Sequence, residues 1–393
     1  MALSLYAGWL TVDDIRDRAS SEHAISEACD RLVSGAEVMK LHGGMVRAEA
    51  GDYDTLDVRE LPSVCTIYKV KDSGKTASLF KLWVEGSNTS QPLNWIGADA
   101  DREPFGGMLA GSHYKPDITA VADRRPEERP LGDGTLGWYE NWYITVRAEC
   151  GPGSSTKAPK LLNVTARAEY ENVSTADRDR LARIAHSAAE RVTDRIGCKT
   201  HLPALPDQQL TPVPSALRPA KGADGSCAWF AAHLKEQGQG RLPDRFLAVP
   251  ISDANPIESC LLAVSPDQVR RIGKGLHGDD GVLVHGGLTY SPWWLRTASY
   301  FGPEAGAVGY HGTRGQGEVI KTGTAGRTYG GWWASSTCDG KPAVHTLSAN
   351  YAYDNVVGSQ ALYDLFRAYV GNITTRHGCT HITYPNRKDF SFE

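Results

Sequence analysis

The stretch RIGCKTH, residues 195–201, returns in similar form as RHGCTH, residues 376–381. In both places a glycine and a cysteine follow a segment whose apolar residues recur at helical spacing. A glycine just past a helix commonly adopts the left-handed conformation that ends the helix. Two distant segments that end alike indicate a repeated unit.

The eight cysteines extend this repeat over the whole chain. Subtracting the first four positions from the last four gives offsets of 198, 195, 188 and 181, which shrink steadily along the chain. At the constant offset of 181, Tyr170 matches Tyr351 and Leu181 matches Leu362. The sequence therefore predicts two tandem duplicated domains that share the cysteines equally, in chain order Cys29, Cys65, Cys150, Cys198, Cys227, Cys260, Cys338 and Cys379.

Each domain is predicted to be α+β. Residues 161–170 and 343–353 alternate apolar and polar side chains as strands do, and a helical pattern follows both segments. Residues 137–150 and 329–338 run through aromatic residues into the third cysteine of each set, which is typical of a hairpin partner strand. We therefore expect an antiparallel sheet with packed helices in each domain, stapled by disulfides.

The domain boundaries follow from composition. Residues 20–41 have helical spacing, and residues 63–70 form a predicted strand that carries Cys65. Residues 201–222 contain five prolines, which is typical of a semi-rigid, extended linker. The predicted organisation is a juxtamembrane or anchor remnant at 1–20, a first repeat at 21–202, a proline-rich linker at 203–222, a second repeat at 223–385 and a tail at 386–393.

The cysteines also indicate the compartment. If each domain folds alone, its four cysteines allow three pairings. We favour first with second and third with fourth, giving Cys29–Cys65, Cys150–Cys198, Cys227–Cys260 and Cys338–Cys379. Disulfides at this density are typical of oxidising compartments, so we expect an extracytoplasmic protein that is membrane-anchored or secreted.

The N-terminus and the net charge bear on partners. The apolar stretch MALSLYAGWL, residues 1–10, gives way abruptly to charged residues, which indicates either the outer end of a membrane helix or an amphipathic terminus. We favour the membrane anchor. The formal charge of −4, with both signs interspersed, argues against nucleic-acid binding.

No catalytic, cofactor or metal motif stands out, and we expect none of these sites. The chain has no C-x-x-C and no H-E-x-x-H, and the glycine-rich stretch at residues 312–331 fits neither nucleotide-binding glycine pattern. The segment GSCAWF, residues 225–230, is similar to the nucleophile segment of papain-like proteases, with His345 as its candidate base. Cys227 corresponds to Cys29 in the repeat, however, and we interpret it as a half-cystine.

Four tryptophans are candidates for a ligand platform. Trp138, Trp142, Trp332 and Trp333 lie on the predicted hairpins. Aromatic rings paired on a hairpin can form a flat surface for sugars or peptides. The alternative, which is the commoner one, is that these rings belong to the core.

The segments ACDRLVSGAEV, residues 28–38, and LARIAHSAAERVTDRIGC, residues 181–198, resemble a family of actinobacterial membrane-anchored extracytoplasmic proteins with tandem four-cysteine domains. The second repeat departs from this pattern at its opening, where GSCAWFAAHL stands at residues 225–234. The resemblance implies a place in the cell envelope and an N-terminal anchor. It assigns no activity and no functional residue.

We expect a binding or structural module of the cell envelope, with an unknown cell-wall or envelope protein partner. Long glycine-rich stretches occur in both repeats, and such loops in compact domains are commonly functional. The alternative is an envelope hydrolase whose site lies in the glycine-rich loops of the second repeat, near His277, His285 and His311.

Overall fold

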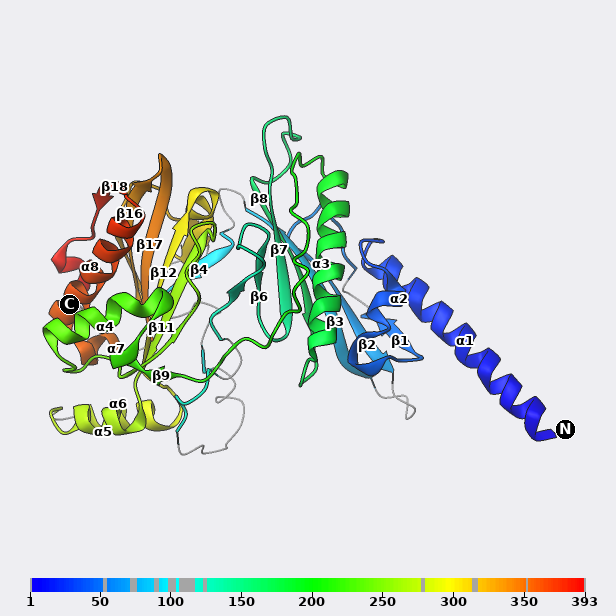
Figure 1. The fold of residues 1–393 in the computed structure, drawn as a ribbon, viewed down its shortest axis with the longest axis horizontal. Helices are drawn as coiled ribbons and strands as arrows, with labels where there is room; N and C mark the ends of the chain where they lie inside the picture. The colour runs from blue at the N-terminus through cyan, green and yellow to red at the C-terminus, as the bar shows by residue number, and fades with distance from the viewer. Residues whose placement is uncertain are drawn as a thin grey trace. The chain divides into compact units, whose positions relative to one another are not determined.

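The structure is a computed structural model. It describes residues 2–51, 55–70, 76–87, 92–97, 104–105, 117–122, 126–276, 280–312, 317–350 and 353–391, without the side chains of residues 2–13 and 280. The chain forms two compact units (Figure 1). The first unit contains residues 1–87 and 130–212, and the second unit contains residues 88–129 and 213–393.

The first unit is a seven-stranded sheet with the order β1-β2-β3-β8-β7-β6-β5. The ladders from β1 to β6 are antiparallel, and α3 packs against β7 and β8. Its helices are α1 Ala2–Ala28, α2 Gly35–Val38, η1 Leu41–Gly43 and α3 Thr175–Arg195. Its strands are β1 Ala48–Ala50, β2 Ser63–Val70, β3 Thr76–Gly86, β5 Arg129–Pro130, β6 Gly137–Tyr139, β7 Tyr143–Glu149 and β8 Leu161–Ala168.

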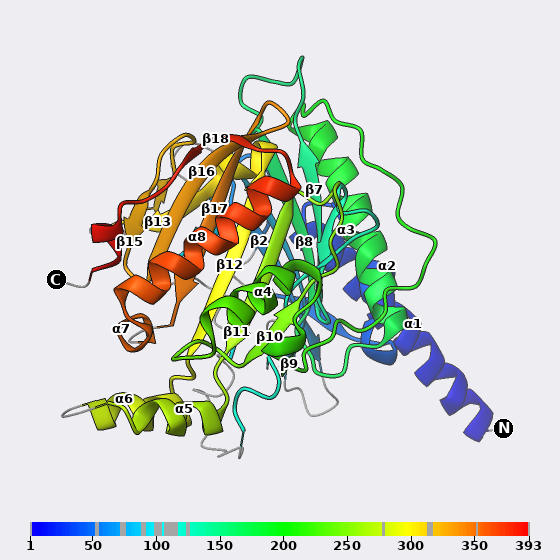
Figure 2. The same ribbon diagram turned by 60° about the vertical axis from the view of Figure 1, so that its left-hand side comes forward.

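The second unit is a sheet with the order β9-β10-β11-β12-β17-β16-β15, in which β18 also pairs with β16. Figure 2 shows α4 and α8 over this sheet, and a separate three-stranded sheet has the order β14-β13-β4. Its helices are η3 Ala220–Gly222, η4 Gly225–Cys227, α4 Ala228–Gln237, α5 Pro266–Gly273, α6 Asp280–Thr289, η5 Gly302–Ala307, α7 Tyr353–Val357, α8 Ser359–Arg376 and η6 Arg387–Phe390. Its strands are β4 Asn94–Ile96, β9 Arg218–Pro219, β10 Arg245–Ala248, β11 Ile257–Ala263, β12 Trp294–Phe301, β13 Val308–His311, β14 Gly317–Val319, β15 Gly326–Thr328, β16 Gly331–Cys338, β17 Lys341–Ala349 and β18 Thr380–Thr383.

Corresponding strands have the same neighbours in the two large sheets. The order β1-β2-β3-β8-β7-β6 in the first unit matches β10-β11-β12-β17-β16-β15 in the second. A long helix then closes each unit, α3 after β8 and α8 after β17. The fold is therefore α+β with antiparallel sheets, as the sequence predicts. The duplication of the domains stays a prediction.

The two repeated stretches end α3 and α8 in the same way. Gly197 has φ 67° and Gly378 has φ 58°, which is the left-handed conformation that glycine adopts easily. The N–H of the following cysteine donates at 2.8 Å to the carbonyl oxygen five residues earlier in both units. This bond is the Schellman helix ending. The bonded pairs are Cys198 with Thr193 and Cys379 with Thr374.

Four disulfides lie within the units, two in each. They join Cys29 to Cys65, Cys150 to Cys198, Cys227 to Cys260 and Cys338 to Cys379, which is the pairing favoured from the sequence. In each unit the second bridge ties the end of the long helix to the end of the neighbouring hairpin strand. Disulfides of this kind indicate an oxidising, extracytoplasmic environment.

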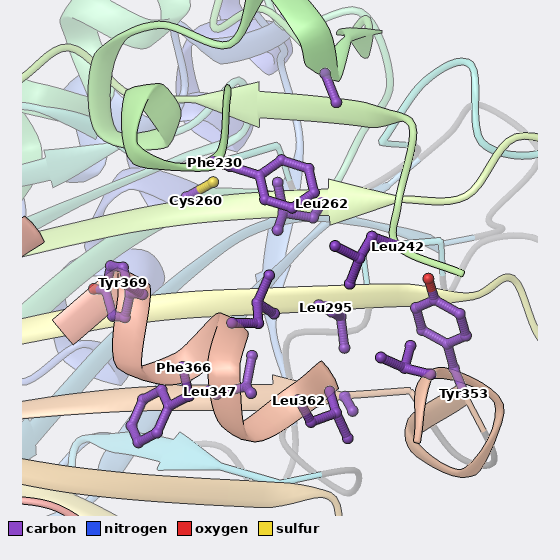
Figure 3. Packing of buried hydrophobic residues seen from close by; sticks show 14 of the residues in the cluster. Phe230, Leu242, Cys260, Leu262, Leu295, Leu347, Tyr353, Leu362, Phe366 and Tyr369 are labelled. Atoms are coloured by element: carbon purple, nitrogen blue, oxygen red, sulfur yellow. The ribbon is translucent and has the colours of Figure 1, made fainter. Parts of the chain in front are cut away.

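The core of the second unit lies between the large sheet and the helices α4 and α8 (Figure 3). Alternate residues of adjacent strands point into it, such as Leu262, Leu295 and Leu347, each 0% exposed. Phe230 from α4 and Phe366 from α8 fill the space above them. The period-two and helical patterns of the sequence thus meet in one apolar layer.

The described residues between 92 and 129 lie with the second unit, although they fall within the predicted first repeat at 21–202. β4 pairs in parallel with β13. Phe105 and Ala122 pack with Trp294 on the side of the sheet opposite to α4 and α8. Glu127 forms an ion pair with Arg296 at 2.7 Å. Burial of these side chains decides to which unit the segment belongs. The order of residues along the chain does not predict this unit.

The proline-rich segment, residues 203–222, is divided between the two units. Its first part is held on α3, where Nε2 of His186 lies 2.9 Å from the Pro203 carbonyl oxygen and the Leu210 N–H donates to Asp179 at 2.9 Å. Its second part contains β9, which pairs with β10. The change of unit, between Pro212 and Val213, falls inside the predicted linker, although the segment is bound along much of its length.

The helix expected over residues 20–41 is broken. α1 ends at Ala28, and α2 begins only at Gly35. Between them Asp30 and Arg31 have φ values of 49° and 55°, which an α-helix does not contain. Arg195 donates to the Asp30 carbonyl oxygen and forms an ion pair with its carboxylate at 2.8 Å, so a tertiary contact holds the break.

Candidate functional site: a groove between two helices

A groove of about 450 Å³ lies between α4 and α8 of the second unit. Each helix contributes residues at spacings of three, four and seven positions, so each presents one face to the groove. The volume lies in the range that is typical of small-molecule sites. We call this site the helix groove; its lining residues are Trp229, Ala232, His233, Glu236, Ala368, Gly371, Asn372, Thr375 and Arg376.

Two largely buried polar side chains line the helix groove, and the indole N–H of one of them lacks a hydrogen-bond partner in the described part of the chain. Trp229 is 4% exposed, and its indole N–H has no partner among the described residues. His233 is 7% exposed, and no hydrogen bond joins its ring to the described part of the chain. Burial lowers the pKa of His233, and the carboxylates of Asp364 and Glu236 only partly oppose this. The imidazole is therefore neutral at pH 7 and offers one donor and one acceptor.

The middle of the helix groove is made of small residues. Gly371 lies in the interior of α8, where glycine costs about 1 kcal/mol relative to alanine. A Cβ atom at Gly371 would meet nothing within 4 Å, so packing does not require a glycine there. Ala368 and Ala232 lie on the same two helix faces. The small side chains leave the backbone of α8 open to close approach.

Arg376 lines one end of the helix groove, and its charge is already balanced. Its guanidinium donates two hydrogen bonds to Glu258, at 2.9 and 2.5 Å. The Glu258 side chain is only 1% exposed and also accepts from His377 at 3.0 Å. Arg376 therefore serves mainly to hold Glu258, and it brings little net positive charge to the groove.

A polar cluster lies sealed in the core next to Trp229. The Tyr369 ring contacts Trp229, and the Tyr369 hydroxyl lies 2.6 Å from the Ser299 hydroxyl. Ser299 in turn lies 2.8 Å from Nδ1 of His345, whose Nε2 lies 2.8 Å from the Ser336 hydroxyl. His345 is 0% exposed, and burial lowers its pKa to about 3. This histidine is a neutral, fully hydrogen-bonded core residue.

The structure rules out the papain-like alternative. Cys227 is bonded to Cys260 and has no free thiol to act as a nucleophile. His345, the candidate base, is enclosed in the core and hydrogen-bonded at both ring nitrogens. The half-cystine interpretation of Cys227 is the one that the structure supports.

Trp332 does not belong to a surface platform. It is 2% exposed, and its ring stacks on Phe390 at 5.1 Å between ring centroids. Its indole N–H donates to the Asp389 carbonyl oxygen at 2.8 Å. This side chain therefore fixes the C-terminal segment to the core of the second unit.

Trp333, the neighbour of Trp332 on β16, does not share a surface with it. Trp333 faces the opposite side of β16, stacks on Tyr310 at 5.2 Å and is 9% exposed. Trp138 and the half-buried Trp142 lie in the first unit. Neighbours on a strand point to opposite faces, so Trp332 and Trp333 cannot share a ligand. Trp332 and Trp333 therefore do not form a common platform on the second hairpin, whereas the pair Trp138 and Trp142 on the first hairpin stays a prediction.

The two described histidines of the hydrolase alternative lie on different elements of the second unit. His277 is outside the described residues. His285 lies on α6, with its ring 6.1 Å from that of Tyr290. His311 lies on β13 and stacks on Trp95 at 4.2 Å. The structure therefore gives the two described histidines separate aromatic partners on separate elements.

Metal-binding groups, membrane-spanning helices and similarity to known proteins bear further on the site. Within the described ranges, no group of three or more His, Cys, Asp or Glu side chains is arranged to hold a metal ion. No helix in the described part of the chain is both long enough and apolar enough to cross a membrane. Comparison with known protein families, curated proteins and solved structures finds no match to this chain.

The helix groove is not among the sites predicted from the sequence. Trp229 stands out there only as part of the papain-like segment, and no motif marks His233 or Gly371. The available signal was the glycine in an otherwise helical pattern, which commonly has a packing or functional reason. The partner face on α4 lies more than a hundred residues earlier in the chain, so no local pattern joins the two faces.

Proposed function

We propose that this chain is an extracytoplasmic binding module that holds its ligand in the helix groove. The observation that carries the proposal is the buried, unpartnered indole N–H of Trp229 in the lining of a groove of about 450 Å³, beside the largely buried ring of His233. An unsatisfied buried polar group costs roughly 1–3 kcal/mol, and a ligand that bonds to it recovers part of this cost. Gly371 adds support, because it keeps the groove open at a cost to helix stability.

We further propose that the module is anchored at the outer face of a membrane in the cell envelope and binds a cell-wall or envelope protein partner. The support is the set of four disulfides, the apolar residues at the start of α1 and the resemblance to actinobacterial envelope proteins. Fractionation of cells that express the native gene, with thiol labelling before lysis, tests this location. Recovery of the protein from the cytosol with free thiols refutes it.

A groove-filling variant tests the binding function. Gly371→Leu places a branched side chain in the helix groove without disturbing α8, since leucine favours helices and no atom lies within 4 Å of the new Cβ. Gln360→Leu adds the same side chain at an exposed position of α8 and is the matched control. The wild type and both variants are screened by thermal unfolding against saccharides, polyols and short peptides.

The proposal expects a ligand that raises the Tm of the wild type and of Gln360→Leu but not that of Gly371→Leu. A ligand that stabilises all three proteins equally binds elsewhere, which contradicts the assignment of the site. A panel in which no compound shifts the wild type also counts against the proposal.

A further inference from the structure

We infer that the helix groove selects a neutral, hydroxylated ligand, that is, a saccharide, rather than an anion. This inference rests on the proposed binding function and narrows its ligand class. It follows from the charges around the groove, the kinds of hydrogen-bonding groups in it and the alternation of polar and small apolar residues along it.

The charges disfavour an anionic ligand. Arg376, the cation that lines the groove, is held by two hydrogen bonds to Glu258. Glu236 is exposed at the rim, and Asp364 lies close enough to act on His233 electrostatically. A carboxylate or phosphate in this position would meet like charges without an available cation, which costs binding energy.

The hydrogen-bonding groups are mixed in kind. Trp229 offers a donor, the Glu236 carboxylate accepts, and a neutral His233 ring does one of each. A hydroxyl group both donates and accepts, so neighbouring hydroxyls on one ligand can satisfy all three side chains. Asn372 and Thr375, on the facing side of α8, carry further groups of both kinds.

The apolar part of the lining fits the same ligand. Ala232, Ala368 and Gly371 present only methyl groups or backbone between the polar residues. A sugar ring has C–H faces bounded by hydroxyl edges, and such a surface matches small apolar patches set among polar groups. The geometry therefore favours the sugar.

The experiment measures binding by titration calorimetry with four probes. These are a neutral glucose oligosaccharide, a neutral N-acetylglucosamine oligosaccharide, a uronic acid oligosaccharide and an uncharged extended peptide. The proteins are the wild type, Gln360→Leu, Gly371→Leu and Trp229→Phe. Phenylalanine removes the indole N–H and retains an aromatic ring. Each variant is first checked for an unfolding transition like that of the wild type. If Trp229→Phe unfolds at a lower temperature, His233→Gln replaces it.

We expect a neutral oligosaccharide to bind the wild type and Gln360→Leu but not Gly371→Leu. Its affinity for Trp229→Phe should be about tenfold lower, which corresponds to the loss of one hydrogen bond. If only the uronic acid oligosaccharide or the peptide binds, and Gly371→Leu abolishes that binding, the saccharide inference is overturned while the proposed binding function stands. If no probe shows binding that depends on Gly371→Leu, both are overturned.

Discussion

Glu258 carries its charge in the interior of the second unit. Its carboxylate, 1% exposed, accepts hydrogen bonds from Arg376 and His377 at the end of α8. Burial raises the pKa of this carboxyl, but the hydrogen bonds from His377 and Arg376 outweigh burial, and the net pKa lies below its usual value. One residue of β11 thus fastens the C-terminal end of α8 to the sheet.

Removing this charge should destabilise the second unit. In Glu258→Gln the Arg376 guanidinium, whose side chain is 27% exposed, loses its counter-charge, and we expect the free energy of unfolding to fall by about 3 kcal/mol. Asp267→Asn is the control, because the Asp267 side chain is 97% exposed in its pair with Arg270 and such pairs contribute at most about 1 kcal/mol. Denaturant unfolding measures both variants. Equal losses would contradict the role given to Glu258.

The same carboxylate makes stability depend on pH. Its folded pKa lies below the unfolded value of 4.5, so its contribution is complete above that pH and is lost as the pH falls through the folded pKa. Below about pH 4.5 the wild type should therefore lose stability more steeply than Glu258→Gln. Identical slopes for the two proteins over this range would show that the direction of the pKa shift is wrong.

At the scale of elements, we expect alanine substitution of two glycines, one within α8 and one just past it, to change the free energy of unfolding in opposite directions. Gly378 lies just past the helix with φ 58°, whereas Gly371 lies in its interior. At neither position would a Cβ atom meet another atom within 4 Å, so backbone conformation alone decides the outcome of substitution.

We expect Gly378→Ala to lower the free energy of unfolding by about 1 kcal/mol, because alanine resists the left-handed conformation. Gly371→Ala should raise it by about 0.5–1 kcal/mol, because alanine favours the helix interior. Thermal unfolding of the two variants side by side measures the difference. A loss of stability in both would show that Gly371 has a packing role that the open space around it does not reveal.

The elements themselves were predictable where a local pattern decides them. Leu181, Ala185 and Leu362 occupy the buried faces of α3 and α8, as their spacing predicts. The break after Ala28 was not predictable, because Asp30 takes its left-handed conformation in a contact with Arg195, far along the chain. Local spacing carries no information about such a partner.

At the scale of the whole molecule, the disulfides divide the chain into two independently stapled units. The bridges close separations of 36 and 48 residues in the first unit and 33 and 41 in the second. In the chain-entropy model each is worth about 3–4 kcal/mol.

Replacing both cysteines of one pair by alanine, for example Cys150 and Cys198, should therefore lower the free energy of unfolding by about 3–4 kcal/mol. Peptide mapping of the unreduced wild type should recover four linked peptide pairs, each within one unit. A linked pair that joins residues before 203 to residues after 222 would contradict this organisation.

The sequence by itself determined the strands, the long helices, the helix-ending glycines and the partition of the cysteines, because each depends on neighbours close in the chain or on matched spacing. Only the tertiary structure decided that the described residues between 92 and 129 lie with the second unit and that the faces of α4 and α8 form a groove. Both outcomes depend on which apolar surfaces are buried together. Burial is non-directional, so the local pattern of the sequence shows which face of an element is buried but not which surface covers it.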